Sequence, residues 1–568
     1  MTELDNLGQL ISTDLLIVGG GLSGLVAAIK AKEAKQDVDV LIVEKQTSGY
    51  SGKAPKGGGF FVVFTPDDDI DKFVEYHVKN IGIFLEDQEL LQLYANESYH
   101  AVEQLSNWGV NVVKRADGKL DSNKNEFNGL WSYVGADADI ELRLRARARK
   151  LGVKIMNKIQ IVDLLKNNND VAGAVGFNII DGNFYIFNAK ATLLANGSCN
   201  YHMRKMWAAG TGDGIAAAFR AGAEMRNAEF GNSCVDAIMR DNESHGHRRL
   251  LFNSLGENIA ERYEPVEGPD MPIELVLGIE KEVLAGRGPI VEDTSKEDKS
   301  VRPRASMFAR VELWNRPYWS ALRQSERGKI LKYEPSHLAT PEVIMIVHGE
   351  LAPIKVDHDM KTSLRGLWAT GDTSWAGSAW TGAISPPAKM RGTGLLNAIL
   401  SAMRGGPSAA LFATREPLLK INPADVKRFK EEIFAPLKRK SGLDPNVSIS
   451  GIQDVIRPIR YSVRRSKERL EEALSKIAQV QQGLPKLGAK DTHGLCKCHE
   501  AVSMTTCAEM SFKAALTRTE SRGFHYREDY PKRDDKNWLK WVIVKYEGGK
   551  VQTSTQPIPI DKYKVKPY

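Results

Sequence analysis

Residues 14–44 constrain the fold of this chain more than any other stretch. The apolar run 14–18 predicts a buried parallel strand, the pattern G-x-G-x-x-G occupies 19–24, and residues 25–34 predict a helix. A second apolar run ends in Glu44, 20 residues after the last of these glycines. Between a strand and a helix, such glycines permit a tight turn, the approach of a pyrophosphate and close helix packing, while the acid binds a ribose hydroxyl. The stretch therefore predicts a dinucleotide site, with the phosphates at the helix N-terminus.

Two later segments favour FAD over NAD. Residues 49–61, GYSGKAPKGGGFF, are rich in glycine and small polar residues, and such a loop can pass close to a flavin. Much later, the segment 365–377 places Gly371 and Asp372 after a short apolar strand. Two cofactor segments so far apart predict a nucleotide domain that is interrupted by a large insertion.

The bulk composition is that of an ordinary enzyme. A chain of 568 residues predicts two to four domains at roughly 150 residues each. Its net charge of +7 is mild, and no nucleic-acid motif accompanies it. No apolar run reaches the length of a membrane span, and the first residues lack the basic region of a secretory signal. We therefore expect a cytoplasmic protein without a membrane span.

The cysteines argue against a disulfide framework and against a metal site. There are five, an odd and sparse number for so long a chain. Cys496, Cys498 and Cys507 lack the spacing of four ligands that a zinc ion or an iron–sulfur cluster needs. We expect no metal ion and no iron–sulfur cluster in this chain.

Four further segments carry a resemblance to a known family. They are AAGTGDGIAAAFRAGAEMRNAEF (208–230), LLFNSLGENIAERY (250–263), RGLWATGD (365–372) and AALTRTESRGFHYREDYPKRDDKNWLK (514–540). In this order they resemble the flavoprotein subunits of succinate dehydrogenase and fumarate reductase, together with the alpha subunit of adenylylsulfate reductase. The GRGPIVEDTSKE segment and the tail are most similar to the adenylylsulfate reductase branch.

The resemblance implies an α/β fold with five sequence regions. A Rossmann-like FAD-binding domain would occupy two pieces, an α+β capping domain would be inserted between them, and a helical domain and a small tail would follow. The expected bounds are 1–235 and 356–410 for the FAD-binding domain, 236–355 for the capping domain, 411–525 for the helical domain and 526–568 for the tail.

The sequence patterns also favour the last two of these regions, the helical domain and the tail. Residues 431–442 and 461–484 have helical periodicity. Residues 538–558 alternate like a hairpin around Gly548 and Gly549.

Departures from the family pattern bear on function. Membrane-bound succinate dehydrogenases attach FAD to a histidine in the loop after the first acid, whereas no histidine lies between Glu44 and Phe61. The resemblance therefore implies noncovalent FAD. The arginine that protonates the substrate in fumarate reductases would fall near Leu277, where no acid–base group stands. His348, followed by Gly349-Glu350, lies near the position of the family's substrate histidine and fits the adenylylsulfate reductase pattern better.

An anionic substrate needs fixed cations, and arginine suits this best. The family places a substrate arginine near 389–391, and Arg391 is favoured over Lys389. Arg240 opens a segment that also holds His245, His247, Arg248 and Arg249, which would bind an anion or shuttle protons, or would form an exposed loop. The catalytic candidates are Arg391, His348 and Arg240.

The glycine loop and the helix that begins near 393 complete the cofactor site. Lys53 and Lys56 would stabilise reduced flavin or pair with the substrate, or would make only a phosphate or surface contact. The predicted FAD-binding residues are Gly19, Gly21, Leu22, Ser23, Gly24, Glu44, Lys45, Ser51, Gly52, Lys53, Gly58, Asn196, Gly197, Asp213, Gly371, Asp372, Gly394 and Leu395. Trp314, Tyr318, Trp319, Trp375 and Trp380 form either a stacking wall for a planar substrate or part of the core.

Three functions are compatible with these observations. The leading hypothesis is an FAD-dependent oxidoreductase that acts on a small anionic substrate and exchanges electrons with a small ferredoxin-like iron–sulfur subunit. Its substrate would be adenylylsulfate or another sulfur oxyanion, or an organic acid or enone. The alternatives are a self-contained flavin oxidase or quinone-linked dehydrogenase, and a flavoprotein that serves only in assembly or electron transfer.

Overall fold

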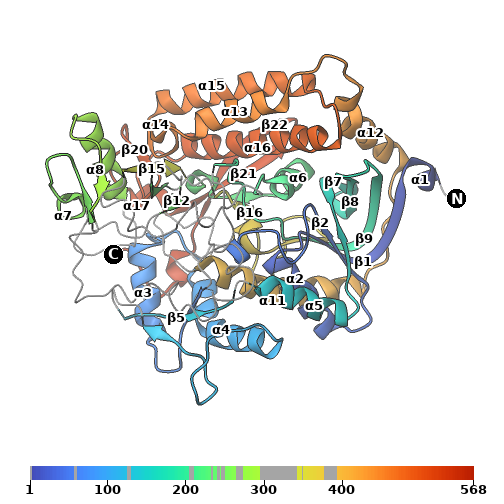
Figure 1. The fold of residues 1–568 in the computed structure, drawn as a ribbon, viewed down its shortest axis with the longest axis horizontal. Helices are drawn as coiled ribbons and strands as arrows, with labels where there is room; N and C mark the ends of the chain where they lie inside the picture. The colour runs from blue at the N-terminus through green and yellow to red at the C-terminus, as the bar shows by residue number, and fades with distance from the viewer. Residues whose placement is uncertain are drawn as a thin grey trace, which may run out of the picture.

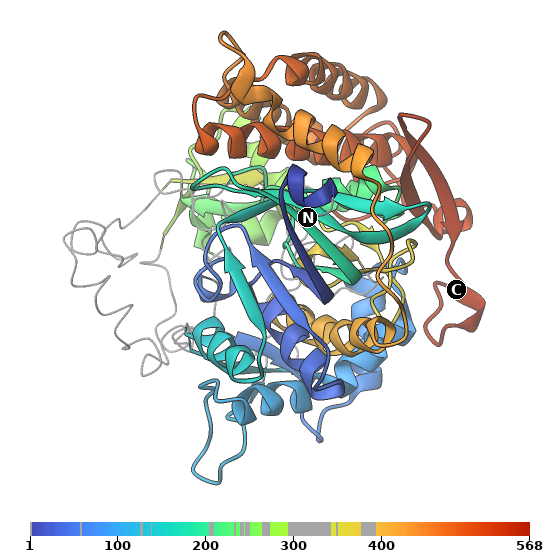
Figure 2. The same cartoon turned by 90° about the vertical axis from the view of Figure 1, so that its right-hand side faces the viewer.

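The computed structural model describes residues 3–56, 60–124, 129–137, 139–203, 210–231, 234–238, 243–244, 250–263, 273–293, 342–347, 350–375 and 393–568. A layer of C-terminal helices covers one side of the molecule, and the N-terminal sheet with its own helices fills the other (Figure 1). The same layering is visible after a quarter turn (Figure 2).

The central sheet has seven strands around a parallel core. Strand β1 pairs in parallel with β2 on one side and with β9 on the other, and β17 extends the sheet from the second half of β9. The first half of β9 pairs with β8, and β8 pairs in turn with β7, both antiparallel. The bounds are β1 (Gln9–Val18), β2 (Val40–Glu44), β6 (Lys154–Asn157), β7 (Ile159–Asn167), β8 (Asp170–Asn178), β9 (Phe184–Leu194) and β17 (Leu367–Ala369).

The first strand, helix and second strand expected from the sequence are confirmed. The strand predicted at 14–18 is longer than expected, because its first half pairs with β9 from Gln9 onward. Helix α2 (Leu22–Ala34) packs against α11 (Thr393–Ala413), the helix that follows the second FAD segment. The two helices approach so closely that a Cβ on Gly406 would lie 2.3 Å from the carbonyl oxygen of Ala27. The packing of α11 on α2 brings together the two pieces of sequence that form the FAD-binding domain.

A second sheet ties the C-terminal tail to the FAD-binding part. Its order is β18-β16-β10-β21-β22. The tail hairpin is confirmed: β21 and β22 are antiparallel, and Gly548 and Gly549 make the turn with φ of +58° and +78°, which glycine adopts readily. The bounds are β10 (Met225–Arg226), β16 (Ile354–Lys355), β18 (Ser374–Trp375), β21 (Lys540–Glu547) and β22 (Lys550–Pro557).

The helical layer confirms the expected helices with corrected ends. The helix predicted at 431–442 is instead α12 (Pro423–Phe434), followed by a 3₁₀ turn, because Pro436 cannot continue the α-helical hydrogen bonds. The one predicted at 461–484 begins only at Lys467 as α15 (Lys467–Gly483), where the Ser466 side chain caps it. Both α15 and α13 (Pro445–Ile456) pack against the long helix α16 (Thr492–Thr517).

The inserted region contributes a small separate core. Strand β11 (Cys234–Ile238) pairs with β12 (Glu243–Ser244) and β15 (Val343–Val347), all antiparallel. Helices α7 (Ile259–Tyr263) and α8 (Ile273–Leu284) lie beside them, far from the N-terminus in Figure 1. The buried apolar residues of this core are Leu251, Ile259, Leu275, Ile279, Ile290 and Val343.

The α/β class with a Rossmann-like nucleotide domain and a helical C-terminal region is confirmed. Within the part of the chain that the structure describes, no helix has the length and apolar character to cross a membrane. The four cysteines whose side chains are described, Cys199, Cys496, Cys498 and Cys507, are all buried thiols.

Candidate functional site

The carboxyl ends of β1, β2, β9 and β17 meet at one edge of the central sheet. Backbone hydrogen bonds join Gly19 N to Val43 O, Ala195 N to Val18 O, and Thr370 N to Leu194 O at 2.8–2.9 Å. Ligands of open α/β sheets bind at such an edge.

The turn after β1 requires glycine at two positions. Gly19 has φ of +111°, and a Cβ there would lie 2.3 Å from the carbonyl oxygen of Ala195. A Cβ on Gly24 would lie 1.9 Å from the carbonyl oxygen of Gly19. A side chain at Gly19 would therefore displace the segment after β9, and one at Gly24 would push the start of α2 away from the turn.

Glu44 lies at the end of β2, as predicted, and holds this turn. Its Oε2 accepts a hydrogen bond from Gly20 N at 2.6 Å, and its Oε1 accepts one from Gln46 N at 2.7 Å. The side chain of Ser48 donates to Gly20 O. The acid is buried and oriented by the backbone of both neighbouring segments.

An anionic group already lies at the N-terminus of α2. Glu141, from α5 (Ile140–Lys150), accepts a hydrogen bond from Leu22 N at 3.0 Å. Ser23 donates to Thr370 Oγ1 at 2.9 Å, so the late segment 365–372 also contacts this helix start. The free N–H groups and the helix dipole favour negative charge here.

Lys53 links the glycine loop to the late segment. Its Nζ donates to Ser198 Oγ at 2.7 Å and lies 3.2 Å from both Glu350 Oε1 and Asp372 Oδ2. Burial lowers the pKa of Lys53, but the carboxylates of Glu350 and Asp372 outweigh it and raise the pKa above its usual value. The ammonium is therefore a fixed positive charge beside Asp372.

Lys45 and Asp213 contact each other. Lys45 Nζ lies 2.8 Å from Asp213 Oδ2, 2.8 Å from Thr211 Oγ1 and 3.0 Å from Glu500 Oε1. Glu500 comes from α16, and no sequence signal connects it to Lys45. The network joins the end of β2 to α6 (Asp213–Ala221) and to the helical layer.

The remaining predicted residues fall into two groups. Ser51, Gly52, Asn196, Gly197, Gly394 and Leu395 are described, and Gly394 and Leu395 open α11. Gly58 and the three catalytic candidates, Arg391, His348 and Arg240, lie outside the described residues, as do His245, His247, Arg248, Arg249, Trp314, Tyr318, Trp319 and Trp380. Trp375 is described and fully buried, as the core interpretation expects.

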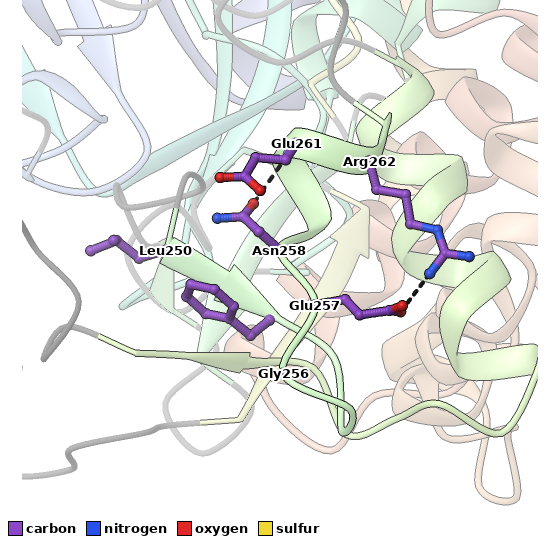
Figure 3. A pocket seen from close by; sticks show the side chains of 7 residues that line it. Leu250, Gly256, Glu257, Asn258, Glu261 and Arg262 are labelled. Atoms are coloured by element: carbon purple, nitrogen blue, oxygen red, sulfur yellow. Dashed lines mark hydrogen bonds and ion pairs between the residues drawn. The ribbon is translucent and has the colours of Figure 1, made fainter.

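The capping region holds an open pocket of about 720 Å³ (Figure 3). Glu257 and Arg262 form an ion pair at 2.5 Å in its wall. Its lining residues are Leu250, Phe252, Gly256, Glu257, Asn258, Glu261 and Arg262.

Behind this pocket, a buried acid holds the capping helices together. Glu282 of α8 accepts hydrogen bonds from Arg287 Nε at 2.5 Å, from Asn253 Nδ2 at 2.9 Å and from the Tyr263 hydroxyl. The hydrogen bonds from Arg287 keep the pKa of Glu282 well below its usual value. Arg287, in the GRGPIVEDTSKE segment, is thus held within its own region, and Leu277 lies half-buried on α8.

One further group of side chains has the composition of a metal site. Ligand atoms of Asp87, Glu89 and His358 lie within 4.8 Å of one another, and His358 Nε2 is 2.8 Å from Asp87 Oδ2.

Comparisons with known proteins match this geometry. The model of the FAD binding domain family matches residues 14–257, and that of the fumarate reductase flavoprotein C-terminal domain matches residues 459–568. Together they cover more than half of the chain. The chain belongs to the fumarate reductase and succinate dehydrogenase flavoprotein family. It is therefore an FAD-dependent oxidoreductase.

Relatives of this flavoprotein match over nearly their whole length. One subunit of the fumarate reductase (CoM/CoB) from Methanothermobacter marburgensis is 25% identical over 94% of this chain and 97% of its own. Quinol fumarate reductase from E. coli has the same fold, with a TM-score of 0.80 at 19% identity over 99% and 98% of the two chains. Adenylylsulfate reductase from Archaeoglobus fulgidus also shares the fold, with a TM-score of 0.78 at 21% identity over 97% of this chain and 96% of its own.

The strand-edge site fits FAD. Besides the glycine turn and the α2 N-terminus, three buried polar atoms have no hydrogen-bond partner among the described residues: Ser51 Oγ, Asn196 Oδ1 and Asn397 Nδ2. They come from the glycine loop, from the segment after β9 and from α11, which are three segments predicted to contact the cofactor. Buried polar groups are normally hydrogen-bonded, so these atoms are suited to the polar groups of a bound cofactor.

Proposed function

We propose that this flavoprotein is the substrate-binding component of a two-component oxidoreductase. It would hold FAD noncovalently, act on a small anionic substrate and exchange electrons with a ferredoxin-like iron–sulfur subunit. The observation that carries the proposal is the nearly complete match, over 94% of this chain and 97% of the relative, to a protein that is one subunit of a fumarate reductase. The cytoplasmic location expected from the sequence is part of the same proposal.

The cysteines support an iron–sulfur cluster on a partner. Cys496 lies against Glu500, and Cys498 contacts the carbonyl oxygen of Gly488. Cys199 and Cys507 contact each other, and burial raises the pKa of the Cys507 thiol well above its usual value. Among the described residues, no three of these thiols lie close enough together to hold a metal ion, whereas a cluster needs four ligands.

The histidines near the glycine loop support noncovalent FAD. His77 is the first histidine in the chain, and it is fully buried with its Nδ1 2.6 Å from Glu86 Oε1. Its imidazole is therefore occupied by Glu86 in the protein interior. Lys53 occupies the glycine loop instead and is held by three partners.

Bound FAD would supply two-electron and hydride chemistry, and the chain would supply position and charge. The glycine turn and the α2 N-terminus would receive the pyrophosphate, and Glu44 would receive a ribose hydroxyl. The start of α11 at Thr393 would offer N–H groups where reduction adds negative charge. Arg391, His348 and Arg240 stay our candidates for binding the substrate and moving its proton.

Two substrate chemistries fit these cations. A sulfur oxyanion attached to a nucleotide and an unsaturated organic acid both present anionic oxygens, which arginine binds well. The first is suggested by the fold shared with adenylylsulfate reductase, and the second by the fumarate reductase relatives.

The test is purification of the protein from its native host. We expect acid precipitation to release FAD, and we expect iron and a small second chain to co-purify. Assays of sulfite plus AMP with an artificial acceptor, and of unsaturated acids with a reduced viologen, then separate the two substrate classes. Flavin that stays in the precipitate would contradict noncovalent binding. An iron-free single chain that turns over with oxygen or a quinone would overturn the partner and favour a self-contained enzyme.

A further inference from the structure

Arg226 is enclosed by two tryptophans at a junction of three segments. It lies in β10, the middle strand of the five-stranded sheet, and is 6% exposed. Its Cζ is 4.3 Å from the ring centroid of Trp541 on β21 and 5.3 Å from that of Trp375 on β18. The two indoles meet edge to face, with centroids 6.4 Å apart. Trp375 lies three residues after Asp372 of the late FAD segment, so this cluster connects that segment to the C-terminal tail.

Two hydrogen-bond donors of this cluster have no acceptor. Among the described residues nothing accepts a hydrogen bond from Arg226 Nε, nor from Trp375 Nε1, and both atoms are sealed from solvent. The Nε1 of Trp541, by contrast, donates to Leu85 O at 2.7 Å. An arginine and an indole N–H cannot satisfy each other, because both are donors only.

The nearest acids are already committed to other partners. Asp87 lies 2.8 Å from His358 and caps α4 (Gln88–Asn107) by accepting from Leu90 N. Glu224 pairs with Lys355 at 2.7 Å. They contribute attraction to Arg226 from a distance, together with Tyr563.

The electrostatics of Arg226 are those of a buried charge that lacks a counter-ion among the described residues. Burial lowers its pKa to about 10, and the distant acids only partly compensate. A buried charge is normally paired and hydrogen-bonded, and an unpaired one is strongly unfavourable. The stacking of the indoles on the guanidinium offsets part of this cost but supplies no hydrogen-bond acceptor.

We propose that Arg226, Trp375 and Trp541 form a binding site for a small oxyanion. The guanidinium supplies the charge and a planar set of donors, the N–H of Trp375 is a further donor, and the indole faces enclose the cation. A carboxylate and a tetrahedral oxyanion share the required chemistry, which is oxygen acceptors with negative charge. This site goes beyond the proposed function, because it requires neither the flavin chemistry nor a second protein chain.

The proposal is tested on the FAD-loaded protein by titration with sulfate and, separately, with formate at constant ionic strength, with chloride as the reference. Tryptophan fluorescence follows binding, since two of the ten tryptophans of the chain belong to the site, and W541F identifies the share of the signal that Trp541 contributes. We expect a saturable change with at least one oxyanion and none with chloride. R226Q is expected to weaken binding at least tenfold, and W541F is expected to reduce the amplitude. R428Q, which removes a half-exposed arginine over the Phe429 ring, is the matched control and should bind like the parent.

Two outcomes would overturn the site. One is the lack of any saturable response of the parent protein to either oxyanion, and the other is an unchanged response in R226Q. If R226Q fails to fold or to retain FAD, a crystal of the parent protein soaked in selenate decides. An anomalous peak within hydrogen-bond distance of the Arg226 guanidinium supports the site, and a peak-free guanidinium rejects it.

Discussion

Lys53 Nζ lies 3.2 Å from Asp372 Oδ2, although 319 residues separate them in the chain. Glu350, at the end of the inserted region, shares the same ammonium group. One lysine therefore connects the glycine loop, the insertion and the late FAD segment.

K53M should weaken FAD binding about tenfold or more, which corresponds to ~1.4 kcal/mol. The substitution leaves the carboxylates of Glu350 and Asp372 close together without their cation. Reconstitution of the apoprotein with FAD, followed by flavin fluorescence, measures the change. K361M removes a half-exposed lysine that pairs with Asp359, and it should leave FAD affinity unchanged. Equal affinities for K53M and the parent protein would contradict the role given to Lys53.

G24A should abolish FAD binding. The added Cβ would lie 1.9 Å from the carbonyl oxygen of Gly19, so the turn and the start of α2 would have to separate. The flavin absorbance of the purified protein measures this. At Gly494, in the first turn of α16, the nearest atoms lie 3.4 Å or more from an added Cβ, so G494A should retain the flavin. A flavin content in G24A equal to that of G494A would show that the close approach is not required.

E500Q should destabilise the protein at neutral pH and flatten its loss of stability in acid. The charge of Lys45 holds the pKa of Glu500 well below its usual value despite burial. A depressed pKa contributes stability that is present above the unfolded value of about 4.3 and is lost as the pH falls towards the folded value. Denaturant unfolding between pH 3 and 7 measures the difference. E103Q, at an acid that is 44% exposed, should unfold like the parent at each pH. If the free energy of unfolding of E500Q falls as steeply in acid as that of the parent protein, this assignment is wrong.

H358Q should lower the melting temperature at pH 6 but have little effect at pH 9. Its hydrogen bond to Asp87 raises the pKa of His358 above 6.5, so this contribution is fully present below the unfolded pKa. It disappears as the pH rises through the folded pKa. Thermal unfolding at the two pH values measures it, and H100Q, at a histidine that is 81% exposed, is the control. If H358Q lowers the melting temperature equally at both pH values, His358 stabilises the protein by packing and not by its charge.

The local elements were predictable because their causes are local. The strand–turn–helix at 14–34 depends on glycine geometry and on apolar runs, and the tail hairpin depends on two adjacent glycines. The bounds of α12 and α15 were wrong by several residues. They were set by single residues, Pro436 and the cap Ser466, that periodicity over a long window does not detect.

The contacts that complete the site were not predictable from one sequence. Glu141 at the α2 N-terminus, Glu350 beside Lys53 and Glu500 beside Lys45 lie 119, 297 and 455 residues from their partners. Acids are frequent in any chain, and nothing in the local sequence marks Glu141 or Glu500. The family pattern did draw attention to Gly349-Glu350, but it did not indicate that Glu350 pairs with Lys53.

The sequence by itself determined that this chain holds a dinucleotide near its N-terminus and that its family is the fumarate reductase flavoproteins. Those properties follow from short segments whose spacing and backbone geometry tolerate little change. Only the tertiary structure decided which charges meet, such as Lys53 with Asp372, and which have no counter-ion among the described residues, such as Arg226 between Trp375 and Trp541. The physical reason is that the energy of a charge depends on burial and on neighbours a few ångströms away, and long-range folding alone sets both.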